Sequence, residues 1–475
     1  MKKDFSRDFL FKINLIFYLL FSFSVCCISQ TLEIHKTFKN EVIINITEPS
    51  NSNVVLEERS LVNGIGWMPY FNHPLPFNVK TWPVKKLNNS NYYNLRVVGD
   101  RAERGKIISA KRLQTWNPFI INLFLVLEGI NVRVSNQVEA WKMEYETVDP
   151  WGSKILASGS IFLPKTSSNK ELPLLFYQHG TILVKTDAPS NNLEIESVLS
   201  GLNESLLGVI AAGNGYFTIM ADYLGMGSGA GFHPYIHARS QATAAIDLST
   251  AAIEQFPNLF INKKESFLLG YSQGGHAAMA LQREIETYHT NSYKIVAAAF
   301  GAGPYDLDGV MINDLLSGRP HPNPYYFGYI LKSYFETYDF PYSLNDVLRR
   351  PYDNLESVID GENSSELVNR YLPSIFIDAL KKEFLDEFKS DMNHPLRLVI
   401  AQNNVLNWKP NSPIRLYHGT KDLNVLYENA LVAKRKLEAN GADKIQIIEP
   451  IKNGNHSTTV IPYLIDSLEW FESFQ

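Results

Sequence analysis

One short stretch places a nucleophile between the small residues needed to expose it: Gly270-Tyr271-Ser272-Gln273-Gly274. The apolar run at 265–269 predicts a buried strand before it, and residues 275–284 predict a helix after it. Glycines two positions before and after the serine let strand and helix approach without a side-chain clash. Such a nucleophile elbow holds the serine hydroxyl beside the free N–H groups of the new helix. Ser272 is therefore the predicted nucleophile of an acyl transfer.

A serine nucleophile needs a histidine as its base, and in this arrangement the chain order is serine, acid, histidine. His456 follows both a predicted strand and the acid candidates, in a loop with Asn453-Gly454-Asn455 that can present it. His418 instead ends a strand, and His394 lies in a stretch without strands. His456 is therefore the predicted base.

Two aspartates are candidates for the acid that orients the histidine. Asp422 lies just past the predicted strand 413–418, at the sheet edge where Ser272 is expected. Asp306 follows the predicted strand 293–300 and remains an alternative, since some proteins of this architecture carry the acid there. Asp443 precedes its strand and so belongs to the opposite edge.

The negative charge of an acyl-transfer intermediate requires two backbone N–H donors, an oxyanion hole. One donor is predicted at Gln273, the residue after the nucleophile. The other is predicted in the loop after strand 172–178, at Thr181 or Gly180, with Thr181 preferred.

A glycine-rich run at 225–231 lacks the Lys-Ser/Thr ending of a phosphate loop, so it predicts a turn-rich loop near the site. His233 and Tyr235 follow it and are predicted to line a substrate pocket. No cluster of histidine, cysteine and carboxylate residues has metal-ligand spacing. Neither a metal nor a cofactor is therefore predicted.

Strands and helices alternate from residue 137 to the end of the sequence, except at 308–395. This alternation predicts an α/β fold whose mostly parallel central sheet is covered by helices on both faces. The expected strands are 137–148, 155–163, 172–178, 215–221, 265–269, 293–300, 413–418 and 444–449. The expected helices are 195–212, 240–256, 275–284, 427–440 and 461–471.

Residues 308–395 are rich in tyrosine, phenylalanine, proline and helix formers. Because they lie between two sheet strands, they predict a helical cap insertion over the edge that carries Ser272. The core is then expected at 131–307 and 396–475. Of the aromatic and apolar side chains of the cap, some are expected to pack it on the core and others to line a channel for an acyl chain; they include Tyr325, Tyr326, Phe327, Tyr329, Ile330, Tyr334 and Phe335.

The first 29 residues combine a basic start with a mostly apolar run, and they predict a cleaved signal peptide that leaves Gln30 first. An uncleaved anchor or a lipid-modified cysteine is a weaker alternative. Cys26 and Cys27 are the only cysteines, so the exported chain would contain no disulfide. An exported, disulfide-free protein fits a bacterial envelope or medium better than a eukaryotic secretory route. Residues 30–130 are assigned to an N-terminal extension, with a small separate β module as the alternative for its first part.

The motifs together resemble the secretory lipase family of α/β-hydrolases and its bacterial relatives. The carrying stretches are Gln178-His179-Gly180-Thr181, Ala221-Asp222-Tyr223-Leu224-Gly225-Met226-Gly227, His233-Pro234-Tyr235, the elbow, His418-Gly419-Thr420-Lys421-Asp422 and Asn455-His456-Ser457. The resemblance spans roughly residues 140–475, implies an α/β-hydrolase fold and favours Asp422 as the acid. The absence of cysteines from the exported chain and the long N-terminal extension depart from a fungal secretory lipase.

The sequence thus predicts an exported serine hydrolase, a lipase or carboxylesterase acting on small-molecule or lipid esters, with contact to a lipid interface as an option. A formal net charge of −5 does not indicate a nucleic-acid partner, and no protein partner is implied. Two alternatives stay open. One is a prolyl- or aminopeptidase-type enzyme of the same fold, and the other is a relative that binds without turnover.

Overall fold

The computed structural model describes six strands in the first hundred residues and, beyond them, residues 102–166, 171–194, 203–338 and 340–475. The predicted signal peptide, residues 1–29, lies outside the described residues. The chain forms two compact units. One comprises Met1–Arg101 with Trp151–Ser153, and the other comprises Ala102–Pro150 with Lys154–Gln475.

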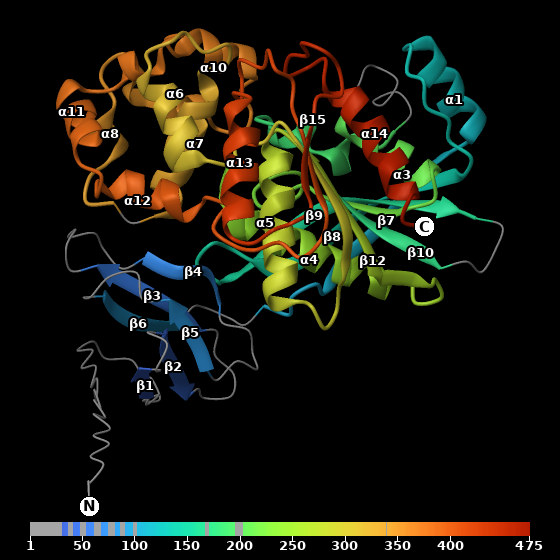
Figure 1. The fold of residues 1–475 in the computed structure, drawn as a ribbon, viewed down its shortest axis with the longest axis horizontal. Helices are drawn as coiled ribbons and strands as arrows, with labels where there is room; N and C mark the ends of the chain where they lie inside the picture. Colours follow the sequence, from blue (N-terminus) through green and yellow to red (C-terminus); the bar gives the residue numbers. More distant parts are fainter. Residues whose placement is uncertain are drawn as a thin grey trace, which may run out of the picture. The chain divides into compact units, whose positions relative to one another are not determined.

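The first unit contains two small antiparallel sheets (Figure 1). One has the order β1-β2-β5, and the other has the order β4-β3-β6. Their strands are β1 (Thr31–Lys36), β2 (Glu41–Thr47), β3 (Val54–Ser60), β4 (Met68–Pro74), β5 (Thr81–Lys85) and β6 (Asn91–Val97). The described strands of this unit therefore form a β module.

The second unit is built on a nine-stranded sheet of order β15-β14-β13-β12-β10-β11-β9-β8-β7. Pairing is parallel from β11 through β10 and β12 to β15, and antiparallel among β11, β9, β8 and β7. The strands are β7 (Ile107–Trp116), β8 (Gln137–Val148), β9 (Lys154–Lys165), β10 (Leu172–Gln178), β11 (Phe217–Ala221), β12 (Ile261–Tyr271), β13 (Ile295–Gly301), β14 (Ile414–Tyr417) and β15 (Ile445–Ile448). The predicted mostly parallel α/β sheet is confirmed.

Helices cover both faces of this sheet, and each face has its own buried cluster of apolar side chains. Helices α4 (Ala238–Gln255), α5 (Gln273–Tyr288) and α13 (Glu428–Ala439) contribute to one cluster. Helices α1 (Pro118–Leu127), α3 (Glu204–Gly213) and α14 (Val460–Glu472) contribute to the other. Strand side chains alternate between the two clusters, because successive residues of a strand face opposite sides.

The sequence placed the start of the hydrolase core at residue 131, and this boundary is wrong. Strand β7 pairs with β8 along most of its length, so the core begins near Ala102. Most side chains of β7 are partly or fully exposed, with only Trp116 buried. A strand held by backbone pairing at the edge of a sheet carries little hydrophobic alternation, and pattern reading misses it.

Residues 307–402, called here the helical segment, separate β13 from β14 and gather into one group (Figure 1). The segment begins with a π-helical turn, η3 (Leu307–Met311). It continues with α6 (Ile312–Leu316), α7 (Tyr325–Thr337), α8 (Leu344–Val347), η4 (Tyr352–Asn354), α9 (Leu355–Val358), α10 (Ser365–Tyr371), η5 (Phe376–Ala379), α11 (Lys382–Ser390) and α12 (Pro395–Gln402). Two short 3₁₀ turns, η1 (Lys185–Asp187) and η2 (Pro189–Asn191), precede α3 in the core.

Within the described part of the chain, no helix is long and apolar enough to span a bilayer.

Candidate active site

The turn from β12 into α5 forces Ser272 into a strained conformation. Its φ and ψ are 59° and −120°, in the positive-φ region that non-glycine residues rarely occupy. The flanking glycines have no room for a side chain. A Cβ on Gly270 would lie 2.1 Å from the carbonyl oxygen of Gly274, and one on Gly274 would lie 1.9 Å from that of Gln178. The Ser272 N–H donates to the Gly301 carbonyl at 2.8 Å, which ties the turn to β13.

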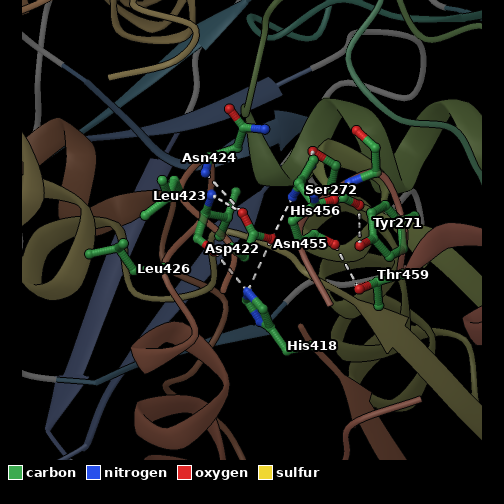
Figure 2. A network of polar contacts seen from close by, with 12 residues as sticks. Tyr271, Ser272, His418, Asp422, Leu423, Asn424, Leu426, Asn455, His456 and Thr459 are labelled. Atoms are coloured by element: carbon green, nitrogen blue, oxygen red, sulfur yellow. Dashed lines mark hydrogen bonds and ion pairs between the residues drawn. The ribbon is translucent and has the colours of Figure 1, made fainter. Parts of the chain in front are cut away.

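His456 lies in the loop between β15 and α14 and faces Ser272 (Figure 2). Its Nε2 is 2.9 Å from Ser272 Oγ, and its Nδ1 is 2.6 Å from Asp422 Oδ2. Two further bonds support the loop. The Tyr271 hydroxyl donates to the His456 carbonyl at 2.7 Å, and the Thr459 hydroxyl donates to the Asn455 carbonyl at 2.7 Å. The imidazole therefore bridges the serine and the carboxylate through its two nitrogens.

Asp422 is buried in the turn that follows β14. Its Oδ1 accepts the backbone N–H groups of Asn424 and Val425 at 2.8 and 3.0 Å, while Oδ2 faces His456. His418 Nε2 lies 3.5 Å from the same Oδ2. Burial raises the pKa of Asp422, but the hydrogen bonds from His418 and His456 outweigh it and hold the pKa well below its ordinary value. The carboxylate is thus charged wherever the imidazole needs orienting.

Asp306, the alternative acid, is used differently. One oxygen accepts the N–H of Val310 at 2.9 Å, which caps η3, and the other pairs with Lys436 Nζ at 2.6 Å. Within the described residues it bonds to no histidine. The structure thus brings Asp422, and not Asp306, to His456.

The two predicted oxyanion donors flank the elbow. Within the described residues, the N–H groups of Gln273 and Thr181 donate to no protein acceptor. The N–H of Gly180 is already donated to Glu204 Oε1 at 2.9 Å. A Cβ built on Gly180 would lie 3.9 Å from the Cβ of Ser272, so this loop runs beside the nucleophile. Of the two residues considered for the second donor, Thr181 is the one with a free N–H.

His233 and Tyr235 were expected in a substrate pocket, and both are buried. His233 Nε2 lies 2.9 Å from the side-chain nitrogen of Gln273. The Tyr235 hydroxyl lies 2.8 Å from Thr181 Oγ1. Each side chain therefore contacts one of the two residues predicted to supply an oxyanion donor, a relation that the sequence did not suggest.

The helical segment contacts the loops around this site. The guanidinium of Arg319 and the amide of Asn323 donate to Leu423 and Asn424 at 2.9 and 2.8 Å, next to Asp422. The Ser333 hydroxyl, from α7, donates to the Tyr235 carbonyl at 3.3 Å.

The sequence matches a family model, that of the Secretory lipase family, over residues 192–473, which is more than half of the chain. This chain belongs to the Secretory lipase family. It is therefore a carboxylic ester hydrolase of the α/β-hydrolase fold, and the resemblance drawn from its motifs is confirmed.

Solved structures agree with the assignment of this secretory lipase to the α/β-hydrolase fold. The rice cell wall degrading esterase LipA from Xanthomonas oryzae superposes with a TM-score of 0.68 and 26% identity, over 78% of this chain and 97% of that one. Candida antarctica lipase A superposes with a TM-score of 0.58 and 17% identity, over 78% of this chain and 82% of that one, which shows a shared fold. No curated protein sequence matches the chain.

Several polar residues of this secretory lipase site could not be recognised in the sequence. Tyr271 occupies the variable position before the serine, yet its hydroxyl holds the histidine loop. The Tyr463 hydroxyl, from α14, accepts the N–H of Gly270 at 2.8 Å and also contacts the Ala299 carbonyl at 3.0 Å. A tyrosine in an amphipathic pattern indicates only a core position, and the fold is needed to show which group its hydroxyl bonds to.

No group of three or more metal-ligating side chains occurs among the residues that the structure describes.

Proposed function

We propose that this secretory lipase cleaves carboxylic esters through a triad of Ser272, His456 and Asp422. The observation that carries the proposal is the unbroken chain of contacts from Asp422 Oδ2 to His456 Nδ1 at 2.6 Å and from His456 Nε2 to Ser272 Oγ at 2.9 Å. These three side chains come from three separate loops, so chance does not readily bring them together.

The geometry supports an acyl-enzyme route. His456 takes the proton of Ser272 as the oxygen attacks the ester carbonyl, and Asp422 stabilises the imidazolium that forms. The negative charge on the former carbonyl oxygen then meets the free N–H groups of Gln273 and Thr181. His456 next gives its proton to the leaving alcohol. A water molecule, activated by the same imidazole, releases the acid from Ser272.

We propose further that the helical segment is a cap that selects the acyl chain. A cavity of about 60 Å³ lies within it, several times the roughly 10–15 Å³ that one water needs. Its lining consists of apolar and aromatic side chains, which favours an aliphatic guest over water. The lining residues are Leu307, Met311, Ile312, Leu315, Phe327, Ile330, Leu331, Tyr334, Phe376, Leu380, Phe384, Phe388, Leu396 and Ile400.

Export is the third part of the proposal. The family is named for secretion, and the basic and apolar residues 1–29 have the pattern of a cleaved signal. The exported chain should therefore begin at or near Gln30. Terminal sequencing of protein recovered from the medium or envelope tests this, and recovery of Met1 or of a lipid-modified cysteine would contradict it.

The activity is tested with two substrate panels and one covalent probe. The purified protein should hydrolyse p-nitrophenyl esters and leave peptide anilides intact. A fluorophosphonate probe should label one residue, and mass spectrometry of the digested protein should find it at Ser272. Hydrolysis of the anilides in preference to the esters would favour a peptidase. Labelling at another serine would show that Ser272 is not the nucleophile.

A further inference from the structure

The turn at residues 233–236 bonds to both sides of the proposed oxyanion hole. Gln273 lies at the start of α5, and Thr181 lies in the loop after β10, so no short stretch of backbone sets the spacing between their N–H groups. His233 bonds to the side chain of the first and Tyr235 to the side chain of the second. We propose that His233 and Tyr235 are positioning residues that hold the two oxyanion donors at a fixed separation. The inference rests on the proposed function, since it assigns these donors a role in ester cleavage.

The bond between His233 and Gln273 requires one particular tautomer of the histidine. His233 Nδ1 lies 3.0 Å from the Leu224 carbonyl, which can only accept, so this nitrogen carries the proton. Nε2 is then an acceptor and matches the amide N–H of Gln273. The ring also stacks on Tyr223, with centroids 5.7 Å apart and an interplanar angle of 11°. Both the orientation and the hydrogen-bonding role of the imidazole are therefore determined.

Burial keeps His233 in this state. Desolvation is the main cause that lowers its pKa to about 3, so the ring is neutral at any ordinary working pH. A protonated Nε2 would put a second donor against the amide of Gln273 and break the contact. A pKa this low also makes His233 a weak base, so it does not compete with His456 for the serine proton.

Tyr235 is held by the helical segment. Its ring stacks on Tyr329 of α7, with centroids 4.3 Å apart and an interplanar angle of 7°. The following residue, Ile236, has a φ of 58°, which is rare for a β-branched side chain, and the Tyr334 hydroxyl donates to its carbonyl at 3.2 Å. A strained turn persists only when its surroundings hold it. Helix α7 therefore supports the turn that supports the two donors.

Positioning of this kind has a distinct kinetic signature. Oxyanion donors bind the charge that develops in the transition state more strongly than the neutral ester carbonyl. A small displacement of a donor should therefore lower kcat and weaken transition-state analogues, while KM changes little. A residue that merely stabilises the fold would lower the amount of active protein without changing the affinity of what remains.

The first experiment removes one hydroxyl. Tyr235→Phe should lower kcat/KM for a p-nitrophenyl ester about 10- to 100-fold and weaken inhibition by a trifluoromethyl ketone by the same factor. Tyr293→Phe is the matched control, because its hydroxyl also bonds to a buried hydroxyl, that of Ser249 at 2.6 Å, away from the site. The control should keep both values. The proposal is overturned if Tyr235→Phe leaves inhibitor affinity unchanged, whatever happens to its rate.

The second experiment removes and restores an acceptor. His233→Ala should weaken the same inhibitor, and His233→Gln, which offers an amide oxygen to Gln273, should restore part of the affinity. His237→Ala is the control, since His237 is also buried but bonds to Ser240. Equal inhibitor affinity in all three variants would contradict the proposal.

Covalent labelling keeps this test apart from that of the triad. Every positioning variant should still take up one fluorophosphonate at Ser272 when the probe is in excess. If the protein without any substitution did not react with the fluorophosphonate, that result would instead contradict the proposed function itself.

Discussion

Two regions of the molecule bury different kinds of side chain. One is the set of three loops that follow strands β12, β14 and β15, and the other is the interior of the helical segment. The loops bury polar groups in defined pairs, and the side chain of Asp422 is fully enclosed, with four donors facing its two oxygens. The segment contains a cavity whose lining side chains are all apolar or aromatic. Buried charges need exact partners, whereas apolar surfaces need only shape and volume. Loss of one atom in the loops should therefore remove function, while loss of a whole ring in the segment should only change substrate preference.

The largest expected effect is at the nucleophile. Ser272→Ala deletes one oxygen and should lower kcat about 10⁶-fold, because the acyl-enzyme can no longer form. Far-ultraviolet circular dichroism should show an unchanged fold. Turnover of a p-nitrophenyl ester by the variant at more than a hundredth of the original rate would contradict the claim that loss of one atom in the loops removes function.

The second largest effect distinguishes the two aspartates that follow sheet strands, Asp422 after β14 and Asp306 after β13. Asp422→Asn should lower kcat about 10⁴-fold, since the amide favours the wrong tautomer of His456. Asp306→Asn should lower stability through its contacts with Lys436 and Val310 and leave kcat within a few fold. Steady-state kinetics on both variants decides the matter, and the reverse result would move the acid to the end of β13.

Acid should destabilise the fold through histidines that are buried uncharged. Mainly through desolvation, the pKa values of His233 and His237 are lowered to about 3 and that of His276 to about 4. Below their ordinary pKa of about 6.5, the unfolded chain binds protons that the folded chain does not, so stability falls with pH. Each group contributes up to about 1.4 kcal/mol per pH unit. These three groups should therefore lower the free energy of unfolding by about 4 kcal/mol between pH 7.5 and 5.5.

Urea unfolding at the two pH values measures this change. His237 caps α4 by accepting the N–H of Ser240. His237→Asn keeps a good capping residue without a titrating group, and should reduce the pH effect by about 1.4 kcal/mol. A pH effect of the same size in the variant would exclude His237 as a source. Asp422 acts in the same direction only at lower pH, below its ordinary pKa, because its own pKa is lowered in the folded state.

The smallest expected effect is in the segment. With soluble esters, kcat/KM should rise from acetyl to medium chains, because each buried methylene contributes about 0.8 kcal/mol, roughly fourfold. Phe327→Ala should flatten this rise. Phe335→Ala is the control, since Phe335 does not line the cavity and stacks instead on Phe340, with centroids 4.6 Å apart. Acetyl esters as the best substrates, with no effect of Phe327→Ala, would indicate an esterase for small or carbohydrate esters.

The parts of the fold that the sequence predicted are those with a local signal. Strand β10 is a run of apolar residues between polar loops, and its predicted bounds, 172–178, match the structure. The elbow is marked by two glycines that steric limits impose on the turn. Strand β7 has no such pattern, since it is held at an edge by pairing with β8 and exposes most of its side chains.

The residues of the candidate site also fall into those that have a local signal in the sequence and those that have none. Chain order and strand ends could nominate Ser272, His456 and either Asp422 or Asp306, and the family resemblance then favoured Asp422. The contacts of His233 and Tyr235 could not be predicted, because a histidine and a tyrosine two residues apart carry no sign of which distant side chains they meet. Of the residues expected to line an acyl channel, Phe327, Ile330 and Tyr334 border the cavity. Tyr329 instead packs on Tyr235.

The bond between His456 and Ser272 joins residues 184 positions apart, and α14 lies still further along the chain. The Tyr463 hydroxyl from that helix ties β12 to β13, directly beneath the elbow. During synthesis the serine is therefore made long before its base and before the helix that secures its strand. A growing chain that ends before residue 456 therefore lacks the histidine that contacts Ser272 Oγ, and one that ends before residue 463 lacks the tyrosine that ties β12 to β13.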